Sequence, residues 1–286
     1  MPNHVTQTVA MKGSEKDIKA IKALMDFCPK DEDKSDSGEY FNFSRILPMP
    51  KSLSGTTSGS NESIANALIN TPKYSFKKES LDKDRNALSA EHPYLLINNP
   101  ITINAKEFTK YKAYLTKHWG GISILMSKSK NISLEETINY LTNKRKYGTT
   151  SWYDWCCSNW GTKWNSYNVR WNDNSVSFDT AWSIPEPVYA ALAKKFPKVK
   201  FVVFFADEDR GSNCGVMVFD GNAVDYYNPA VMDKEVALNF AYIMQGDEEA
   251  EEITEKSSFY ALAFLSKYTP IPMNDVETQI SNLNFL

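Results

Sequence analysis

Apolar residues alternate with polar ones, or recur at helical spacing, over the first fifty positions. Residues 4–11 alternate, which is typical of a half-buried strand. Ser14 and Asp17 then resemble a capping box, and the apolar residues that follow recur every three or four positions, which predicts a helix. Residues 40–46 alternate again. This part of the chain therefore predicts a strand, a helix and a second strand.

Residues 51–163 predict a mainly helical insertion. Its entrance, 51–61, is rich in Ser, Thr and Gly, and residues 73–91 are highly charged with little apolar periodicity. Such a segment contributes little to a core, so we expect 51–91 to supply binding specificity. The expected helices cover residues 63–70, 104–119 (ended by Gly120-Gly121), 133–147 and the aromatic stretch 151–159.

Strands return in the second half of the chain. The turn residues Asn172, Asp173 and Asn174 separate two alternating runs, which predicts a hairpin. The expected strands cover residues 168–171, 176–182, 200–206 and 214–219. The expected helices cover residues 185–196, 233–245 and 257–267, with an acidic run at 247–255.

This order predicts an α+β fold, a ferredoxin-like split β-α-β sheet with a large mainly helical insertion and C-terminal helices. We expect residues 1–50 and 164–232 to form the ferredoxin-like core. Residues 51–163 would form the insertion with its aromatic segment, and residues 233–286 a C-terminal helical extension.

Composition and charge narrow the classes of function. The 286 residues are 42% hydrophobic with a net charge of −3, which suits a packed domain and gives no overall attraction to nucleic acid or to an anionic membrane. The first residues lack a basic and apolar leader, and no apolar run approaches the ~18 residues of a membrane span. The four cysteines fit no disulfide framework. We therefore expect a cytoplasmic protein with no membrane partner.

Four segments resemble a known family. They read MPNH at the start, FNFSRILPMP at 41–50, YGTTSWYDWCCSNWGTKWN at 147–165 and FDTAWSIPEPV at 178–188. Together they resemble the YubB-type ferredoxin-like family, Api-like proteins encoded by bacterial phages, conjugative plasmids and integrated elements. The resemblance implies a ferredoxin-like fold, a mobile-element origin and a bacterial host cell, and it implies no catalytic residues.

The densest aromatic segment is the first candidate for a binding surface. It holds Trp152, Trp160 and Trp164, together with Lys163. These tryptophans either pack against the side of the sheet or form a stacking platform for a base or a partner loop. The surrounding Gly-Thr-Lys lacks the spacing of a phosphate-binding loop. All four residues are kept as partner-binding candidates.

A charged turn is the second candidate. Asp207, Glu208 and Asp209 follow an apolar strand, where carboxylates can hold Mg²⁺ or transfer protons, although a turn between antiparallel strands needs neither. No histidine lies at metal-ligand spacing from a cysteine, and a Cys156–His118 nucleophile pair stays open. We expect no metal, no cofactor and no catalytic residue, and keep the acidic turn as a partner-binding candidate.

Three functions follow from these features. The first is a non-enzymatic accessory protein of a phage or mobile element that binds a host bacterial protein or protein complex and inhibits a defence complex. The second is nucleic-acid binding through the ferredoxin-like sheet. The third is a metal-dependent enzyme that uses Asp207 and Glu208. Homo-oligomerisation stays open. Exposed aromatics flanked by Lys or Arg on the open face of the sheet would favour nucleic acid, and a mixed or acidic face would favour protein.

Overall fold

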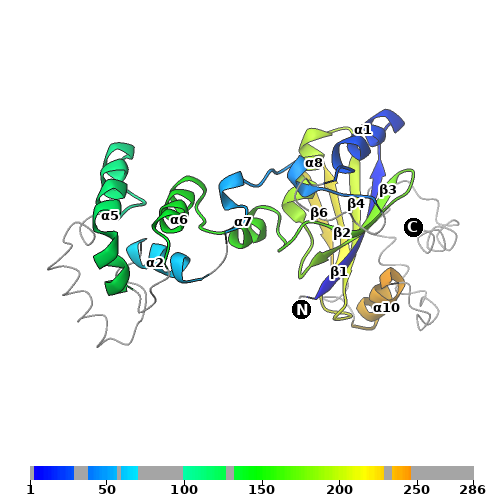
Figure 1. The fold of residues 1–286 in the computed structure, drawn as a ribbon. Coiled ribbons are helices and arrows are strands. Elements are labelled where there is room, and N and C mark those ends of the chain that lie inside the picture. Colours follow the sequence, from blue (N-terminus) through cyan, green and yellow to red (C-terminus); the bar gives the residue numbers. More distant parts are fainter. Residues whose placement is uncertain are drawn as a thin grey trace, which may run out of the picture. The chain divides into compact units, whose positions relative to one another are not determined.

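The computed structural model describes residues 3–28, 38–56, 59–69, 99–126, 132–228 and 234–245. The chain divides into two compact units (Figure 1). One unit comprises Met1–Pro48 and Cys156–Leu286 and contains the sheet, and the other comprises Met49–Trp155. The residues 156–163, which the sequence placed with the insertion, therefore lie in the sheet unit.

Six strands form one sheet in the order β2-β3-β1-β4-β5-β6. Every neighbouring pair is antiparallel. The strands are β1 (His4–Lys12), β2 (Tyr167–Trp171), β3 (Ser175–Ala181), β4 (Lys200–Asp207), β5 (Cys214–Asp220) and β6 (Ala223–Tyr227).

Two split β-α-β halves make up the ferredoxin-like part of this sheet. Helix α1 (Glu15–Met25) connects β1 towards β2, with β3 lying between the two strands. Helix α8 (Glu186–Lys195) connects β3 to β4, with β1 between them. This is the ferredoxin-like arrangement, so the predicted α+β fold is confirmed. Strands β5 and β6 extend the sheet beyond β4.

The strand predicted over residues 40–46 is wrong. This stretch contains a short 3-10 helix, η1 (Phe43–Arg45), which Asn42 caps by accepting a hydrogen bond from the Ser44 N–H. Phe41 and Phe43 alternate because both are buried: the Phe41 ring stacks on Phe178 of β3 at 4.8 Å. The second strand of the fold is β2, so the insertion lies between α1 and β2 in the chain.

One face of the sheet packs against α8. Gln7 of β1 points to this face, where its Oε1 accepts a hydrogen bond from the buried Tyr189 hydroxyl of α8 at 2.5 Å. Gln7 also donates to the Thr180 hydroxyl of β3 at 2.6 Å. Both polar groups of this buried amide are thereby satisfied in the core.

A second helix, α10 (Lys234–Gln245), packs on the other face of the sheet. Phe240 and Met244 contact buried Val202, Phe204 and Val218 of β4 and β5. Phe204 pairs with Thr8, whose side chain alternates with that of Gln7, so α10 and α8 lie on opposite faces (Figure 1). The helix expected over 233–245 is present, whereas the expected helix 257–267 and acidic run 247–255 lie outside the described residues.

Strand β6 was not predicted from the sequence. It follows a turn in which Gly221 has a φ of 61°, a conformation that glycine adopts without a steric cost. Only Tyr227 of this edge strand is buried, and Val224 and Tyr226 are exposed. An edge strand with a single buried residue has little apolar alternation, which is why the sequence pattern did not indicate it.

The unit Met49–Trp155 has a hydrophobic core of its own. Its elements are η2 (Lys51–Leu53), α2 (Ser60–Ile69), α5 (Ala105–Met126), α6 (Leu134–Tyr147) and the first residues of α7 (Trp152–Asn159). The core is formed by buried apolar residues of α2, α5 and α6, among them Ile64, Leu68, Tyr111, Leu115, Tyr140 and Leu141. Residues 70–98, which include the whole charged stretch 73–91, lie outside the described residues.

The helix break predicted at Gly120-Gly121 is wrong. Helix α5 continues through both glycines to Met126. Each glycine costs a helix about 1 kcal/mol relative to alanine. Leu115 before the pair and Ile122 after it are both fully buried, so tertiary packing holds both halves of the helix in register.

Candidate functional site

Trp160 lies in the core of the sheet unit. Its side chain is 5% exposed, and its indole N–H donates to the Leu47 carbonyl at 2.8 Å. The ring also meets Phe43 edge-on at 5.7 Å between centroids. Of the two alternatives for the aromatic segment, Trp160 fits the packing one, and we do not include it in the candidate site.

Two exposed tryptophans share one lysine at the end of β3. Trp164 is 39% exposed and Trp182, the residue after β3, is 42% exposed. The Lys163 ammonium lies 4.3 Å from the Trp164 ring centroid and 4.9 Å from that of Trp182. Two exposed tryptophans that share one lysine are a candidate for an interaction surface. We call these three residues the tryptophan platform.

Trp182 has a left-handed backbone conformation, with a φ of 70°. This conformation costs a non-glycine residue about 1–2 kcal/mol. Hydrogen bonds on both sides hold it: the Trp182 N–H donates to the Asn3 carbonyl at 2.9 Å, and the Trp182 carbonyl accepts from the Asn213 amide at 3.2 Å. The neighbouring Ala181 carbonyl accepts from the Thr162 hydroxyl at 2.7 Å.

Backbone strain that surrounding contacts over-determine is concentrated at functional sites. The Trp182 side chain stays 42% exposed in this conformation. Hydrogen bonds of Trp182 with Asn3 and Asn213, and of Ala181 with Thr162, fix the backbone that presents this exposed indole.

A pair of substitutions at Trp182 tests this strain. Trp182→Gly and Trp182→Ala remove the same ring, but only glycine adopts a φ of 70° without steric cost. We expect the free energy of unfolding of the glycine variant to exceed that of the alanine variant by about 1 kcal/mol, so the glycine variant is the more stable one. Urea denaturation of both proteins measures the difference, and an alanine variant of equal or greater stability would contradict the assigned strain.

Asp207 anchors the loop beside the tryptophan platform. Its carboxylate is buried and accepts hydrogen bonds from the Asn3 amide at 3.2 Å, the Asn213 amide at 3.1 Å and the Asp209 N–H at 2.9 Å. These donors use both carboxylate oxygens, which fits a structural role. Glu208 and Asp209 are exposed on the same turn. Among the described residues no group of three or more His, Cys, Asp or Glu side chains is placed to hold a metal ion.

The open face of β1, β2 and β3 is chemically mixed. It carries Arg170 and Asp179 beside hydroxyl side chains such as Thr6. Its aromatic residue, Tyr167, is half-buried, and its hydroxyl lies 2.7 Å from Nδ1 of His4. Such a face differs from a row of exposed aromatics flanked by lysines, which single-stranded nucleic acid would require for stacking.

The Tyr167 hydroxyl stays protonated. Partial burial is the main cause that raises its pKa, and the carboxylates of Asp179 and Glu208 raise the pKa further. The hydroxyl is therefore a poor proton acceptor at neutral pH, and its contact with His4 is best understood as holding the start of β1 against β2.

Residues 159–261 match the family model described as "Ferredoxin-like domain in Api92-like protein". These residues are similar to the ferredoxin-like domain of Api92-like proteins. The match begins at the NWGTKWN segment and includes Trp164, Trp182 and the Asp207 turn, and it confirms the resemblance to Api-like proteins. All three residues of the tryptophan platform thus lie within the matched domain.

A crystal structure of a protein api92 from Yersinia pseudotuberculosis is similar over 79% of this chain and 98% of that chain. The two sequences are 12% identical, and the TM-score is 0.28. No curated protein matches the chain. Within the part of the chain that the structure describes, every helix is too short or too polar to cross a membrane.

Trp152 lies in the other unit, outside the residues that the family model matches. Its backbone N–H donates to the Thr56 hydroxyl at 2.9 Å, and its ring meets Tyr153 edge-on at 6.0 Å. Trp152 is half-buried. It therefore fixes the start of α7 to the 51–56 segment, and we do not group it with the tryptophan platform.

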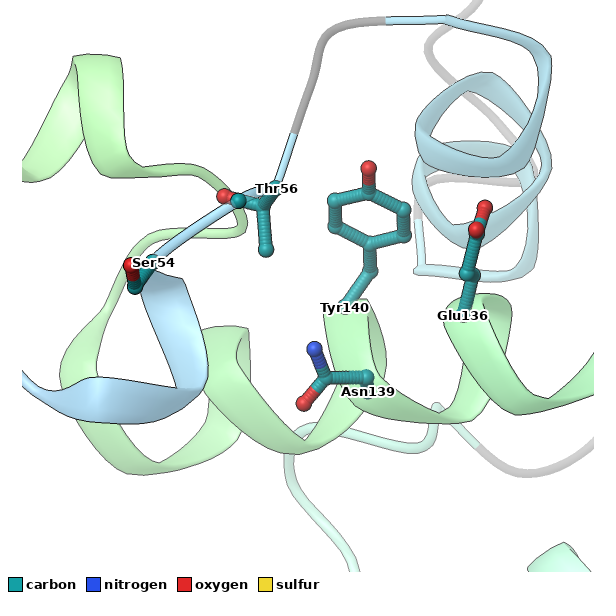
Figure 2. A pocket seen from close by; sticks show the side chains of 6 residues that line it. Ser54, Thr56, Glu136, Asn139 and Tyr140 are labelled. Atoms are coloured by element: carbon teal, nitrogen blue, oxygen red, sulfur yellow. The ribbon is translucent and has the colours of Figure 1, made fainter. Parts of the chain in front are cut away.

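A small polar pocket lies beside this segment (Figure 2). In Figure 2 the Tyr140 ring stands between Thr56 and Glu136, with Asn139 below it. The pocket volume is about 100 Å³, whereas small-molecule sites typically have volumes of about 300–1,000 Å³. Its size fits solvent or a single side chain, so we do not assign it a ligand. It is lined by Ser54, Gly55, Thr56, Glu136, Asn139 and Tyr140.

The two buried thiols of the sheet unit are poor nucleophiles. Burial, with a smaller contribution from Cys157, raises the pKa of Cys156 to about 12, and burial raises the pKa of Cys214 to about 11. At neutral pH both thiols are protonated, and only the thiolate attacks. This disfavours the Cys156–His118 nucleophile pair considered from the sequence.

Alkylation measures this difference in reactivity. At pH 8 we expect iodoacetamide to modify the exposed Cys28 rapidly and the buried Cys156 and Cys214 only in denaturant. Folding raises the pKa of both buried thiols from the ordinary value of about 9. The free energy that these neutral thiols contribute to folding should therefore be present in full below pH 9 and decrease as the pH rises above about 9. Peptide mass spectrometry follows the labelling, and native Cys156 that reacts as fast as Cys28 would contradict the assignment.

Proposed function

We propose that this chain is a non-enzymatic binding protein that holds a partner protein on the tryptophan platform, Trp164, Lys163 and Trp182. The observation that carries the proposal is Trp182: a strained backbone, fixed by hydrogen bonds, presents an indole that remains 42% exposed. A second exposed tryptophan and a lysine complete the surface. Tryptophan is among the residues that most often carry the binding energy of protein interfaces.

We further propose that the partner is a protein or protein complex of a host bacterium, that binding takes place in its cytoplasm, and that the chain is an accessory protein of a phage or other mobile element. The resemblance to Api-like proteins supports the origin. Inhibition of a defence complex is the role that this origin and a binding surface without catalytic residues favour.

The open face of the sheet supports a protein partner over nucleic acid. A nucleic-acid surface gains most of its affinity from lysine and arginine contacts to phosphates. Here Glu208 and Asp209 are exposed beside the tryptophan platform, and Asp179 lies on the open face, so phosphates would meet carboxylates. Nucleic-acid binding stays the second candidate, and the experiment below separates the two.

The test uses three tagged baits in bacterial lysate, each with and without nuclease. The baits are the natural chain, a Trp164→Ala/Trp182→Gly double variant, and a Phe27→Ala control. Phe27 is matched to the platform because it is 44% exposed and has Arg45 4.5 Å above its ring. We expect a partner protein that survives nuclease, is held by the natural chain and by Phe27→Ala, and is lost from the double variant.

Two results would contradict the proposal. Capture that disappears on nuclease treatment would indicate nucleic acid. The other contradicting result concerns a variant in which a short Gly/Ser linker replaces residues 70–98. If the double variant still captures the partner, and the linker variant loses capture at an unchanged melting temperature, the partner surface lies on the insertion. The second result is the one that the charge and low periodicity of residues 73–91 predict from the sequence.

A further inference from the structure

The Lys163 side chain already occupies a cation position over two indoles. Its ammonium is within 5 Å of both ring centroids, at 4.3 Å from Trp164 and 4.9 Å from Trp182. The face of an indole carries negative electrostatic potential and attracts a cation. The position between the two indole faces therefore attracts a cation, whether it belongs to Lys163 or to another molecule.

The loops around this position carry a net negative charge. Residues 161–166, 182–186 and 207–213 are joined by hydrogen bonds: the Ser183 hydroxyl donates to the Gly161 carbonyl, and the Asn213 amide donates to the Trp182 carbonyl. These three loops contain four carboxylates and two cations, a net charge of −2. The carboxylates of Glu186, Glu208 and Asp209 are on exposed residues. A cationic partner segment would therefore meet complementary charge as well as the indole faces.

We propose that Lys163 is an internal placeholder, and that the tryptophan platform receives an arginine side chain from a basic segment of the partner protein. This inference rests on the proposed function and specifies the chemistry of its partner. The partner arginine takes the position over the two rings, and Lys163 moves out into solvent on its flexible side chain. A guanidinium is planar and less strongly hydrated than an ammonium, so it stacks on an aromatic face more favourably.

The placeholder lowers the affinity for a cationic ligand in the natural chain. An incoming arginine must displace the Lys163 ammonium from both rings before it can contact them. Replacing Lys163 with methionine, which has a similar length and no charge, removes this competition. We expect the Lys163→Met variant to bind an arginine peptide about fivefold more tightly than the natural chain does.

The probe is the peptide Gly-Gly-Arg-Gly-Gly, with Gly-Gly-Glu-Gly-Gly as its acidic counterpart. Titrations are followed through the indole N–H resonances of Trp164 and Trp182, assigned with single Trp→Phe variants. Lys195→Met serves as the charge control, because Lys195 is an exposed residue in the last turn of α8 and its loss changes the net charge equally.

The expected result is that the arginine peptide shifts both indole resonances and binds more tightly to Lys163→Met but not to Lys195→Met. Two results would overturn the placeholder. One is that the glutamate peptide shifts these resonances and loses binding in Lys163→Met, which would make Lys163 itself the contact for an acidic partner. The other is that neither peptide shifts them. In both cases the bait experiment above still decides separately whether the tryptophans hold a partner.

Discussion

Replacing Trp160 with alanine is expected to lower the free energy of unfolding by about 3–5 kcal/mol. The ring is 5% exposed, packs edge-on against Phe43, and donates its N–H to the Leu47 carbonyl. The substitution removes a large buried side chain and leaves the half-buried Leu47 carbonyl without its donor. Urea unfolding followed by far-UV circular dichroism measures the loss.

Two variants make this result specific to the buried ring. Trp160→Phe keeps an aromatic ring but loses the hydrogen bond to Leu47, so it should fall between the natural chain and Trp160→Ala. Trp164→Ala removes an exposed tryptophan from the same segment and should change stability by less than about 1 kcal/mol. If Trp160→Ala and Trp164→Ala lower the free energy of unfolding equally, the assignment of Trp160 to the core and Trp164 to the surface is wrong.

Removal of the Asp207 carboxylate is the second large effect expected. Asp207→Ala leaves the donors of Asn3, Asn213 and Asp209 without their acceptor, and we expect it to cost about 3 kcal/mol. Asp207→Asn keeps one acceptor oxygen but places an amide donor opposite another donor, so we expect about half of that loss.

The Asp207 variants also test whether this carboxylate has a role beyond structure. Asn3 and Asn213 contact both Asp207 and the backbone of Trp182, so partner capture should fall in parallel with stability in both variants. Thermal melts and capture with the same baits provide the two measurements. Asp207→Asn that melts like the natural chain and yet loses all function would instead indicate an acid–base or metal-binding carboxylate.

Local sequence chemistry predicted the regular elements well where the signal was a cap or a turn. Ser14 and Ser133 both cap helices by accepting N–H hydrogen bonds, from Asp17 and Glu136 respectively. The alternation over residues 40–46 was misleading, because two phenylalanines that pack on a sheet from a 3-10 turn have the same spacing as a strand. The spacing of apolar residues shows which side chains are buried, but it does not show whether the backbone that carries them is a strand or a turn.

The sequence predicts two of the three residues of the tryptophan platform. Trp164 and Lys163 belong to a segment whose aromatic density drew attention to it. Trp182 was assigned to the end of a strand, where a large apolar residue is expected to be buried. Its importance depends on a positive φ and on contacts from Asn3 and Asn213, and no single-sequence pattern shows either.

The most direct measurement is the affinity of the captured partner, once purified, for the natural chain and for Trp164→Ala/Trp182→Gly. Isothermal titration calorimetry gives both constants, and Phe27→Ala provides the matched exposed aromatic. If the tryptophan platform holds the partner, the double variant should bind about 100-fold more weakly at an unchanged melting temperature, and Phe27→Ala should bind normally. An affinity of the double variant within about twofold of the natural chain would contradict this assignment.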